Sequence, residues 1–379
     1  MRLLNRFSRR DFLQTTIKGT AATMAASAMA ASTSTLASAM MTSKKKNRKL
    51  GVALVGLGYY STDLLAPALQ LTEHCALRGI VTGSPKKIPV WQKRYGIKDE
   101  NVYNYENMHT VADNPDIDVI YIVLPTFLHK KYSVIAANAG KHVWCEKPMA
   151  MTVSECQEII DACNKNRVKL SIGYRLQHEP NTQTLVQFAE TKPYGAIKHV
   201  VSEAGYDGNG FAPDNWKMYT SKGGGALYDM GVYPINAARY ATGMEPVAIS
   251  ATAINPDPKK FQHTDPAAKW TLSFPGDVEA ACQTSTLDYM NHLKVDCEKG
   301  WYELKPMQSY TGVKGRTSDG KQLDKQVANQ QAKQMDDDAL AILHDRQVLV
   351  PGQEGLNDIR VVEAAFRSIK AGGKEVKIS

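Results

Sequence analysis

The first half of the sequence alternates unbroken apolar runs with stretches whose apolar residues recur at helical spacing. Parallel strands that are buried on both faces have such unbroken runs, because neither face meets water. The alternation therefore predicts βαβ units and a parallel sheet covered by helices. The predicted strands are 50–55, 76–81, 118–124, 141–145 and 169–173, and the predicted helices are about 61–72, 130–139 and 152–164, the last opened by a T-x-x-E capping box.

From about residue 197 the pattern changes to β-rich runs accompanied by a few longer helices. This arrangement is typical of an α+β domain built on a mostly antiparallel, open sheet. The predicted strands are 197–205, 246–254, 269–274, 277–286 and 292–303, and the predicted helices are about 223–242, 325–345 and 356–371.

The length of 379 residues exceeds what one hydrophobic core usually supports, so we expect two domains. The fold class is α/β, with a Rossmann dinucleotide-binding domain at 49–172 and an α+β substrate and oligomerisation domain at 173–379. We expect the last helix of the second domain to pack back on the first.

The start of the chain predicts export. Residues 1–39 combine the twin arginines Arg9 and Arg10, a mildly apolar Ala/Thr/Met stretch and the small-residue cleavage site Ala-Ser-Ala at 37–39, as in a twin-arginine signal peptide. This segment carries five Lys/Arg and one acid, so its removal lowers the formal net charge from +8 to +4. The basic arm at 40–48 then predicts a solvated lead-in, with no nucleic-acid role and no stable membrane insertion.

Cysteine and histidine spacing argues against several kinds of site. The six cysteines show no C-x-x-C pattern, and Cys156 and Cys163 fall on one helix face, so we predict core thiols without a structural disulfide. The nine histidines form no H-x-H or H-E-x-x-H cluster, which argues against a metal site. No G-x-S-x-G elbow is present, which disfavours a nucleophilic hydrolase.

The first predicted strand ends in the sequence G-L-G-Y-Y-S, residues 56–61. Gly56 permits a tight turn, Gly58 lets the backbone approach a pyrophosphate, and Ser61 is the small residue that close helix packing requires. Because the motif lies inside a βαβ unit, it indicates a dinucleotide site.

The second predicted strand ends without an acid to bind the ribose hydroxyls of NAD. Thr82, Ser84 and Lys87 follow it instead, and hydroxyls and lysines attract a 2′-phosphate that a carboxylate would repel. The sequence therefore favours NADP over NAD.

Two further loops end strands of the same sheet: L-P-T-F-L-H at 124–129 and C-E-K-P at 145–148. Ligands of open parallel sheets bind at the carboxyl ends of the strands, so both loops are expected to face one crevice. Glu146 and Lys147 would then lie where cofactor and substrate meet, with His129 a candidate cofactor contact and His178 a candidate substrate contact.

Three glycines precede a helix that carries Asp229 and Tyr233 in the segment K-G-G-G-A-L-Y-D-M-G-V-Y, residues 222–233. The i, i+4 spacing puts both side chains on one helix face. A tyrosine hydroxyl serves as an acid or base near neutral pH only where a neighbouring positive charge favours the phenolate, and Lys147 can supply that charge.

Several of these segments resemble the glucose-fructose oxidoreductase group of the Gfo/Idh/MocA superfamily. They are G-L-G-Y-Y, L-P-T-F-L-H, C-E-K-P, G-Y-R at 173–175, G-G-G-A-L-Y-D-M-G-V-Y and P-G-Q-E-G-L-N-D at 351–358. The resemblance implies that Lys147, Asp229 and Tyr233 form the catalytic set. Tyr233 would carry the proton, Lys147 would polarise the reacting oxygen, and Asp229 would orient the sugar.

Taken together, the loops and the resemblance give the expected binding residues. Those expected for substrate are Lys147, His178, Asp229 and Tyr233. Those expected for the cofactor are Gly56, Leu57, Gly58, Tyr59, Tyr60, Thr82, Ser84, Lys87, Tyr105, Leu124, Pro125, Thr126, Leu128, His129, Glu146, Lys147, Arg175, Trp216, Lys217 and Tyr310.

Export restricts the mechanism, because a periplasm supplies little free NADP. We expect NADP to be loaded in the cytoplasm, to travel inside the folded protein and to be recycled in place while one aldose is oxidised at C1 to a lactone and a second sugar carbonyl is reduced. Alternatives are a conventional NAD(P)-dependent sugar or inositol dehydrogenase, an NAD-assisted glycoside hydrolase, and a nucleotide-holding sensor. The expected partners are sugars, the twin-arginine export machinery and further copies of the chain, as a dimer or tetramer that covers the open sheet.

Overall fold

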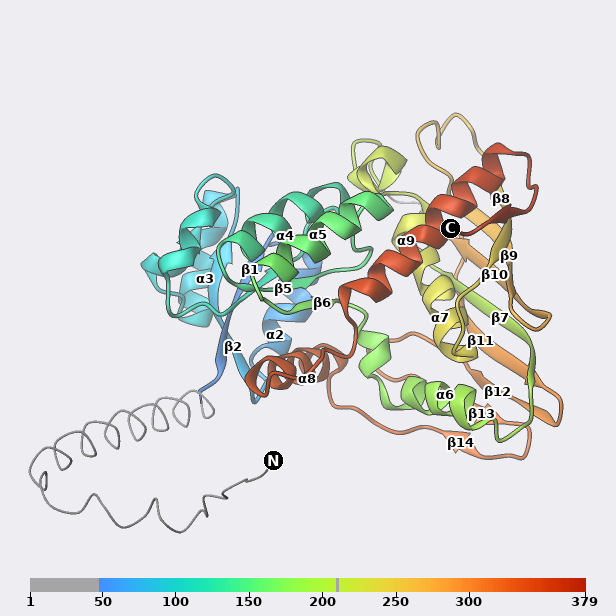
Figure 1. Cartoon of the computed structure of the whole chain (residues 1–379). Coiled ribbons are helices and arrows are strands. Elements are labelled where there is room, and N and C mark those ends of the chain that lie inside the picture. The colour runs from blue at the N-terminus through green and yellow to red at the C-terminus, as the bar shows by residue number, and fades with distance from the viewer. Residues whose placement is uncertain (1–47, 209–210) are drawn as a thin grey trace, which may run out of the picture. The chain divides into compact units, whose positions relative to one another are not determined.

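Two β-sheets organise the part of the chain that the structure, a computed structural model, describes: residues 48–208 and 211–379. Residues 49–379 pack together as one unit (Figure 1). The predicted signal peptide at 1–39 and all but the last residue of the predicted arm at 40–48 lie outside the described residues. The boundary at 172/173 stays a prediction.

The first sheet has six parallel strands in the order β3-β2-β1-β4-β5-β6. The order reverses between β1 and β4, and such a switch point is where a crevice for ligand opens at the carboxyl ends of the strands. The predicted Rossmann-like sheet is therefore confirmed. Its strands are β1 (Leu50–Val55), β2 (Cys75–Val81), β3 (Val102–Tyr103), β4 (Val119–Ile122), β5 (His142–Cys145) and β6 (Leu170–Ile172).

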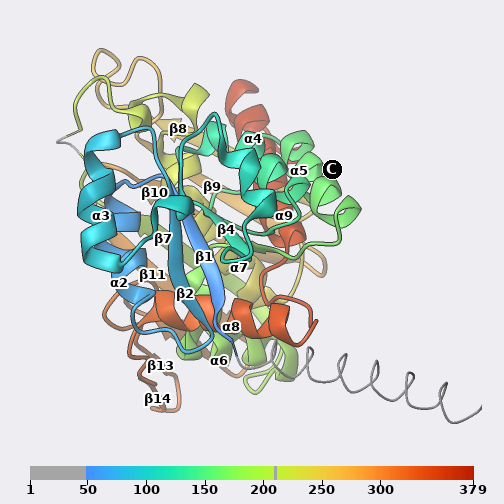
Figure 2. The same cartoon turned by 90° about the vertical axis from the view of Figure 1, so that its left-hand side faces the viewer.

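Helices cover both faces of this sheet (Figure 2). On one face lie α2 (Ala66–Ala68) and α3 (Ile88–Tyr95), and on the other lie α4 (His129–Asn138) and α5 (Val153–Lys165). The helix predicted at 61–72 is shorter than expected, because a π-helical turn at Tyr60–Leu65 leads into α2, which ends at Ala68. α3 has only a weak apolar pattern, since Trp91 is its one buried residue.

One of the two hydrogen bonds of the predicted capping box forms at the start of α5. The hydroxyl of Thr152 accepts a hydrogen bond from the backbone N–H of Glu155 at 3.1 Å. The carboxylate of Glu155 reaches back to the N–H of Met151 instead of that of Thr152. The cap fixes how the chain leaves the C-E-K-P loop, because α5 begins five residues after Pro148.

The second sheet has nine strands in the order β14-β13-β12-β11-β7-β10-β9-β8-β15. Every pair is antiparallel except β7 and β10, which confirms a mostly antiparallel sheet. The run predicted as one strand at 292–303 is a hairpin, because its apolar pattern continues across the turn at 298–299. The strands are β7 (Ile197–Gly205), β8 (Ala248–Ile254), β9 (Ala267–Phe274), β10 (Val278–Ser285), β11 (Met290–Cys297), β12 (Gly300–Leu304), β13 (Gly315–Thr317), β14 (Gln322–Leu323) and β15 (Val376–Lys377).

Four helices from the second half pack on both sheets. α6 (Pro180–Thr191), which the sequence did not predict, α7 (Val232–Thr242) and α9 (Gly352–Lys370) lie against the second sheet. α9 also contacts α5 of the first half, where Glu363 accepts a hydrogen bond from the N–H of Val153 at 2.9 Å. α8 (Gln330–Leu343) instead closes the core of the first sheet through Ala332, Met335 and Ala339.

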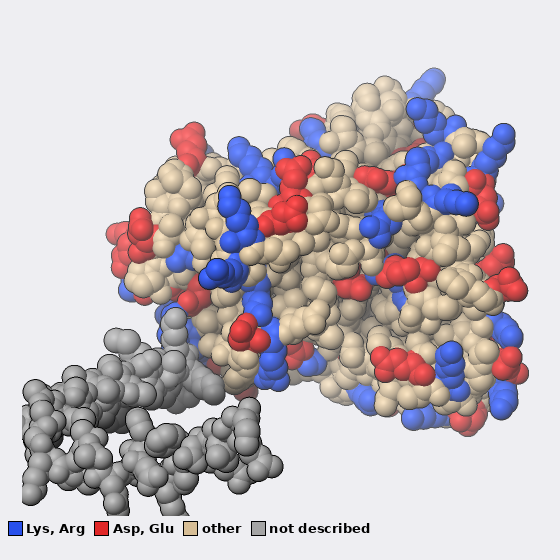
Figure 3. Space-filling view, viewed as in Figure 1, with Lys and Arg blue, Asp and Glu red and all other residues tan. Residues whose placement is uncertain are grey.

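The surface and the thiols have ordinary features. Lys and Arg are interspersed with Asp and Glu over the face seen in Figure 3. All six cysteines are free, and Cys156 and Cys163 are buried on α5 as predicted. Among the described residues, no helix is both long and apolar enough to cross a membrane.

A buried ionic network holds α7 and α9 together. Arg239 of α7 is 3% exposed and donates to Asp358 of α9 at 2.7 Å and to Glu354 at 3.1 Å, while Glu245 binds the other edge of its guanidinium. Asn236 donates to the second oxygen of Asp358 at 3.0 Å. Because a buried carboxylate without its cation is costly, this network fixes how α7 lies against α9.

We predict that Arg239→Met lowers the free energy of unfolding by about 3 kcal/mol or more, since it leaves the fully buried Asp358 uncompensated. The measurement is denaturant unfolding at neutral pH. The double variant Arg239→Met/Asp358→Asn should recover part of the loss. Equal stability of the single variant and the parent would contradict this account.

Candidate active site

The glycine turn lies where the first strand meets its helix. Gly56 has φ +90°, and a β-carbon there would lie 2.4 Å from the carbonyl oxygen of Val123 on the neighbouring strand. Nothing lies within 4 Å of the place where Gly58 would carry a side chain. The hydroxyl of Ser61 donates to the carbonyl of Gly56 at 2.6 Å and closes the turn. The backbone is thus open beside Gly58, as an approaching pyrophosphate requires.

The residues expected at a 2′-phosphate gather beside this turn. The amine of Lys87 donates to the carbonyl of Leu57 at 2.5 Å, and the hydroxyl of Thr82 accepts from the N–H of Ser84 at 3.1 Å. The ring of Tyr105 lies against Gly83, where a β-carbon would come within 3.0 Å of it. One corner of the sheet therefore holds a lysine, two hydroxyl residues and an aromatic ring.

His129 joins the loops that follow β4 and β5. Its two ring nitrogens lie 2.7 Å from the carbonyl oxygen of Leu124 and 2.8 Å from that of Pro148. A neutral imidazole can donate to only one of them, and burial lowers the pKa of His129. The side chain is 1% exposed and braces both loops, so its cofactor contact stays a prediction. Leu124, Pro125 and Leu128 are partly buried in the same loop.

The amine of Lys147 lies between the two sheets. It donates to the backbone carbonyl of Asp229 at 3.0 Å and sits 4.4 Å from the centre of the Tyr233 ring. Burial alone lowers the pKa of this amine, but Tyr233, Asp229 and Glu146 raise it above its ordinary value, so the amine is a cation. The amine of Lys147 therefore contacts both Asp229 and Tyr233, which come from a distant segment of the chain.

The glycines before α7 allow this approach. A β-carbon on Gly223 would lie 2.4 Å from the β-carbon of Thr126, and one on Gly224 would lie 2.4 Å from the carbonyl of Lys217. Any side chain at either position would therefore push the start of the helix away from the crevice.

Asp229 is held by groups that sequence analysis placed elsewhere or missed. One carboxylate oxygen accepts from the amine of Lys217 at 2.8 Å and from the hydroxyl of Tyr206 at 2.5 Å. Burial alone raises the pKa of Asp229, but the charges of Lys217 and Lys147 outweigh it and hold the pKa below its usual value. Trp216 lies beside Lys217, with its ring centre 5.9 Å from the amine. This pair therefore borders Asp229.

A line of aromatic and cationic contacts joins the glycine turn to Tyr233. The ring of Tyr60, which follows the turn, lies 6.4 Å from that of Tyr310. The guanidinium of Arg175 lies 4.5 Å from the centre of the Tyr310 ring and 5.9 Å from that of Tyr233. Tyr59, by contrast, is 67% exposed.

Glu146 is a buried carboxylate next to Lys147. It accepts a hydrogen bond from the hydroxyl of Tyr121 on β4 at 2.7 Å, and Gln334 of α8 donates to that hydroxyl at 3.2 Å. Burial raises the pKa of Glu146 to about 7, although Tyr121, Lys147 and Arg175 all lower it. This carboxyl therefore changes its charge near neutral pH.

His178 lies in a separate cluster. Its side chain is buried, and its Nδ1 lies 2.9 Å from a carboxylate oxygen of Asp337 on α8. Asp338, also buried, adjoins it, and burial raises the pKa of Asp338 to about 6. The structure shows no contact of His178 with Lys147, Asp229 or Tyr233, so the substrate contact of His178 stays a prediction.

The arrangement fits a bound dinucleotide. The glycine turn has room for a pyrophosphate, and the chain of contacts from Tyr60 to Tyr233 leads from it to the Lys147 amine. The Nε of Arg175 is buried without a hydrogen-bond partner among the described residues, and a bound group that offers an acceptor would satisfy it. No cluster of three metal-ligating side chains exists in the described ranges.

Sequence analysis missed Tyr206, Tyr121 and Gln334. Tyr121 had a usable signal, because a tyrosine inside an unbroken apolar run places a hydroxyl in the core, where it needs a partner. Tyr206 lies just beyond a strand, and Gln334 lies on a polar stretch of a helix. Neither position has a local pattern that points to the site.

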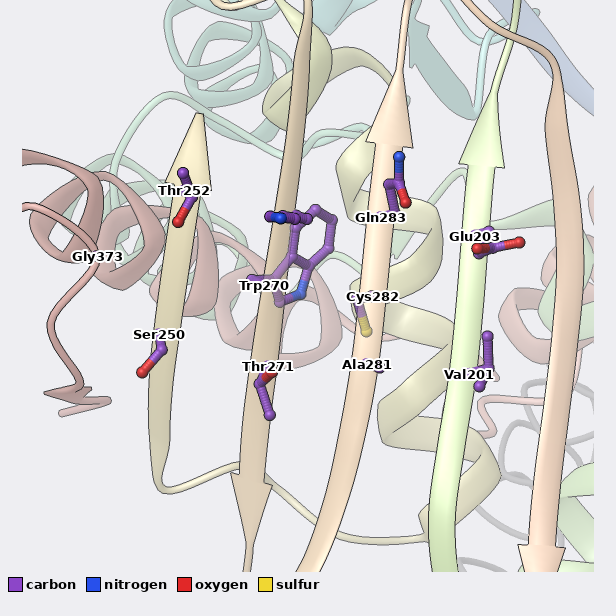
Figure 4. Close-up of a pocket in the computed structure, with 11 residues that line it drawn as sticks. Val201, Glu203, Ser250, Thr252, Trp270, Thr271, Ala281, Cys282, Gln283 and Gly373 are labelled. Carbon is purple, nitrogen blue, oxygen red and sulfur yellow. The ribbon is translucent and has the colours of Figure 1, made fainter. Parts of the chain in front are cut away.

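A separate depression lies on the second sheet. Side chains of β7, β8, β9 and β10 line a hollow of about 380 Å³ on its open face (Figure 4). Its lining includes Glu203, Lys269 and Gln283 but not Lys147, Asp229 or Tyr233. The hollow is therefore separate from the candidate active site.

Family comparison matches both halves of the chain. Residues 50–174 match the sequence model of an oxidoreductase family described as having an NAD-binding Rossmann fold, and residues 182–303 match the GFO/IDH/MocA C-terminal domain.

Individual relatives agree with this match. D-xylose 1-dehydrogenase [NADP(+)] of Haloarcula marismortui is 26% identical over 333 residues, which cover 83% of this chain and 90% of the relative. The crystal structure of aldose-aldose oxidoreductase from Caulobacter crescentus, complexed with glycerol, is 36% identical with a TM-score of 0.82, covering 87% of this chain and all of that one. The scyllo-inositol dehydrogenase of Lactobacillus casei shares the fold at 18% identity, with a TM-score of 0.72 over 87% of this chain and 99% of that one.

We predict that Glu146→Gln changes the pH dependence of stability. The raised pKa means that the folded protein binds the Glu146 proton more tightly than the unfolded chain does, so this contribution is complete below about pH 4.5 and is lost as the pH rises to about 7. Relative to the parent, the variant should gain about 3 kcal/mol between these limits. Denaturant unfolding at pH 4.5, 5.5, 6.5 and 7.5 measures the difference, and a constant difference would contradict the assignment.

Proposed function

This chain belongs to the Gfo/Idh/MocA oxidoreductase family, and on that premise we propose that it is an exported sugar oxidoreductase with tightly held NADP. In this proposal, the protein oxidises an aldose at C1 to a lactone and then reduces the carbonyl of a second sugar. The observation that carries the proposal is the contact of the Lys147 amine with both Asp229 and Tyr233, at the end of a line of side chains that begins at the glycine turn.

The roles of the three residues follow from their contacts. Tyr233 faces the Lys147 amine and is the residue that takes the proton of a sugar hydroxyl and, in the second half of the cycle, gives one to a carbonyl oxygen. The Lys147 cation polarises the sugar oxygen. Lys217 and Tyr206 hold one oxygen of Asp229 and leave the other to accept a sugar hydroxyl. The nicotinamide supplies the hydride transfer when bound, and the protein supplies orientation and the proton.

NADP is favoured by the corner that holds Thr82, Ser84 and Lys87. The Lys87 amine is a cation within reach of the glycine turn, and no acid follows β2 to repel a phosphate. The NADP dependence named for the xylose dehydrogenase relative supports the same choice.

Retention of the cofactor is supported by contacts from both halves of the chain. Tyr60 follows the glycine turn, whereas Tyr310 comes from the segment after β12, and Arg175 stacks on Tyr310. A dinucleotide lying along this line would be enclosed between them. Enclosure suits a protein that is exported folded by the twin-arginine route into a periplasm with little free NADP, which remains part of the proposal.

Each of the other candidate functions differs from the proposed one in a measurable property. A conventional sugar or inositol dehydrogenase exchanges its cofactor with solvent, an NAD-assisted glycoside hydrolase releases a glycosyl leaving group without net oxidation, and a nucleotide-holding sensor turns nothing over. The name of the aldose-aldose oxidoreductase, the structural relative at 36% identity, favours the internally recycled cofactor.

We also propose that copies of the chain associate through the second sheet. α7 and α9 cover one face of this sheet, whereas the hollow of Figure 4 lies on the face that they leave open. A mostly antiparallel sheet can leave one face to solvent, and a second copy packed against this face would cover it in a dimer or tetramer.

We predict that the purified protein carries about one NADP per chain and that an aldose alone reduces it. Mass spectrometry identifies the released nucleotide, and absorbance of the reduced nicotinamide follows the single turnover. A second sugar should then reoxidise the cofactor without any added nucleotide. A protein that is isolated without nucleotide and needs free NADP for each turnover would be a conventional dehydrogenase.

We predict that Tyr233→Phe lowers the rate of nicotinamide reduction about 10²- to 10⁴-fold, because it removes the proton carrier. Bound nucleotide and the melting temperature should stay near those of the parent. Tyr240→Phe is the matched control, because it also removes one tyrosine hydroxyl from α7 but does so near the other end of the helix. Turnover of Tyr233→Phe close to that of Tyr240→Phe would reject the catalytic assignment and favour a sensor.

A further inference from the structure

Glu146 is a buried carboxylate for which the proposed cycle has no role. Both of its carboxylate oxygens lie against Gly173, which follows β6: a β-carbon there would come within 2.6 Å of one and 3.0 Å of the other. The residue is 7% exposed. Only the hydroxyl of Tyr121 donates to the carboxylate from a side chain of the described residues. Burial destabilises this anion more than Tyr121, the two neighbouring cations and a backbone hydrogen bond from Lys147 stabilise it.

The groups that face Glu146 come from every neighbouring element. Tyr121 comes from β4 and is held by Gln334 of α8, Lys147 follows it in the chain, and Arg175 lies on the turn after β6. Tyr60 from the glycine turn and Tyr310 from the segment after β12 also interact with its charge. Two cations and three tyrosine hydroxyls therefore surround one carboxyl.

The charge of the site changes during the cycle, and Glu146 can compensate for that change. Asp229 forms an ion pair with Lys217 at 2.8 Å, whereas Glu146 forms no ion pair within 4.0 Å in the described part of the chain, although the charges of Lys147 and Arg175 act on it. An oxidised nicotinamide adds one positive charge to the site, and a reduced one adds none. A buried charge that appears without compensation is costly, whereas a proton gained or lost nearby cancels it.

We propose that Glu146 stores the proton of the reaction, carrying it while the bound nicotinamide is reduced and giving it up when the nicotinamide is oxidised. This inference rests on the proposed function, since it assigns a further residue to the same site. With this storage, the net charge of the protein and its cofactor stays the same in each half of the cycle.

The atoms and charges balance in both halves. Oxidation at C1 breaks a C–H bond and an O–H bond. A bound oxidised nicotinamide would supply the acceptor for the hydride, and the hydroxyl proton would leave through Tyr233 and end on the Glu146 carboxylate. Glu146 would thus lose its negative charge as the cofactor loses its positive one. In the second half, the sugar carbonyl receives the hydride at carbon and the stored proton at oxygen. No proton has to enter or leave the protein.

The position of Lys147 supplies the link between donor and store. Its amine touches Tyr233, and Glu146 precedes it in the chain and contributes to its charge state. Lys147 therefore lies next to both residues and is an ammonium before and after the proton moves between them.

The proton affinity of Glu146 lies in the range that storage needs. Burial raises its pKa to about 7. A unit positive charge within about 6 Å, at an effective dielectric constant of about 20, lowers a carboxyl pKa by about 2 units. At pH 6 the carboxyl would then be mostly ionised beside the oxidised ring and mostly protonated beside the reduced one.

The test counts protons released for each nicotinamide reduced. The nucleotide-loaded protein is mixed with an aldose in weak buffer, with an indicator dye for protons and absorbance for the reduced nicotinamide. We expect well under half a proton per nicotinamide at pH 6, rising to about one at pH 9. One proton at every pH would overturn the proposal.

Variants separate Glu146 from other groups. Glu146→Gln should release about one proton at both pH values, whereas Glu158→Gln, an exposed acid on α5, should match the parent. Tyr121→Phe keeps the carboxyl but removes the hydrogen bond that lowers its pKa, so the proton deficit should extend to higher pH. A deficit that persists in Glu146→Gln would place the store on another residue.

An infrared difference spectrum decides the question without turnover. Protein freed of nucleotide is loaded with oxidised or reduced NADP, and a protonated-carboxyl band should be present only with the reduced form and absent in Glu146→Gln. If the aldose fails to reduce the cofactor, the proposed function fails, and this comparison still tests Glu146. An unchanged carboxyl band in the parent would overturn the storage role.

Discussion

The site depends on one charged amine that is partly withdrawn from water. Lys147 lies two residues beyond β5, a buried strand of the first sheet, and its amine has a backbone carbonyl and a phenol ring of the second half as its neighbours. Because a cation that is partly withdrawn from water needs partners, these contacts bring the start of α7 to the carboxyl end of β5. The glycines at 223 and 224 make the approach possible, since a side chain at either would collide with Thr126 or with the backbone of Lys217.

The helix that carries Tyr233 is fixed from its other end. Arg239 ties α7 to Asp358 and Glu354 of α9, and Gln177 donates to Asn236 of the same helix at 2.9 Å. Gln177 belongs to the short turn that also carries Arg175. The buried polar network thus sets the positions of both the phenol and the guanidinium of the site, although neither is part of the network.

The sequence was most informative where chemistry and spacing coincided. Gly56 and Lys147 follow strand ends, and Asp229 and Tyr233 have i, i+4 spacing. These local patterns allowed the contacts of Lys147 with Asp229 and Tyr233 to be anticipated. Tyr206 and Gln334 reach the site only because distant segments fold beside it, and nothing in their neighbours indicates this. The hairpin at 290–304 has the sequence pattern of one strand, because the alternation of apolar residues continues across its two-residue turn. The apolar patterns of α6 and α3 are too weak to distinguish these helices from loops.

The covering of the first sheet by α8 has a consequence for how the chain acquires its structure. Gln334 lies 213 residues beyond Tyr121, its hydrogen-bond partner, and α8 brings Met335 against the apolar side of the sheet that carries Trp144. A nascent chain that has emerged only as far as β6 has α2 and α3 on that side of the sheet but lacks the apolar residues of α8. The first half therefore has an incomplete core until α8 has been synthesised.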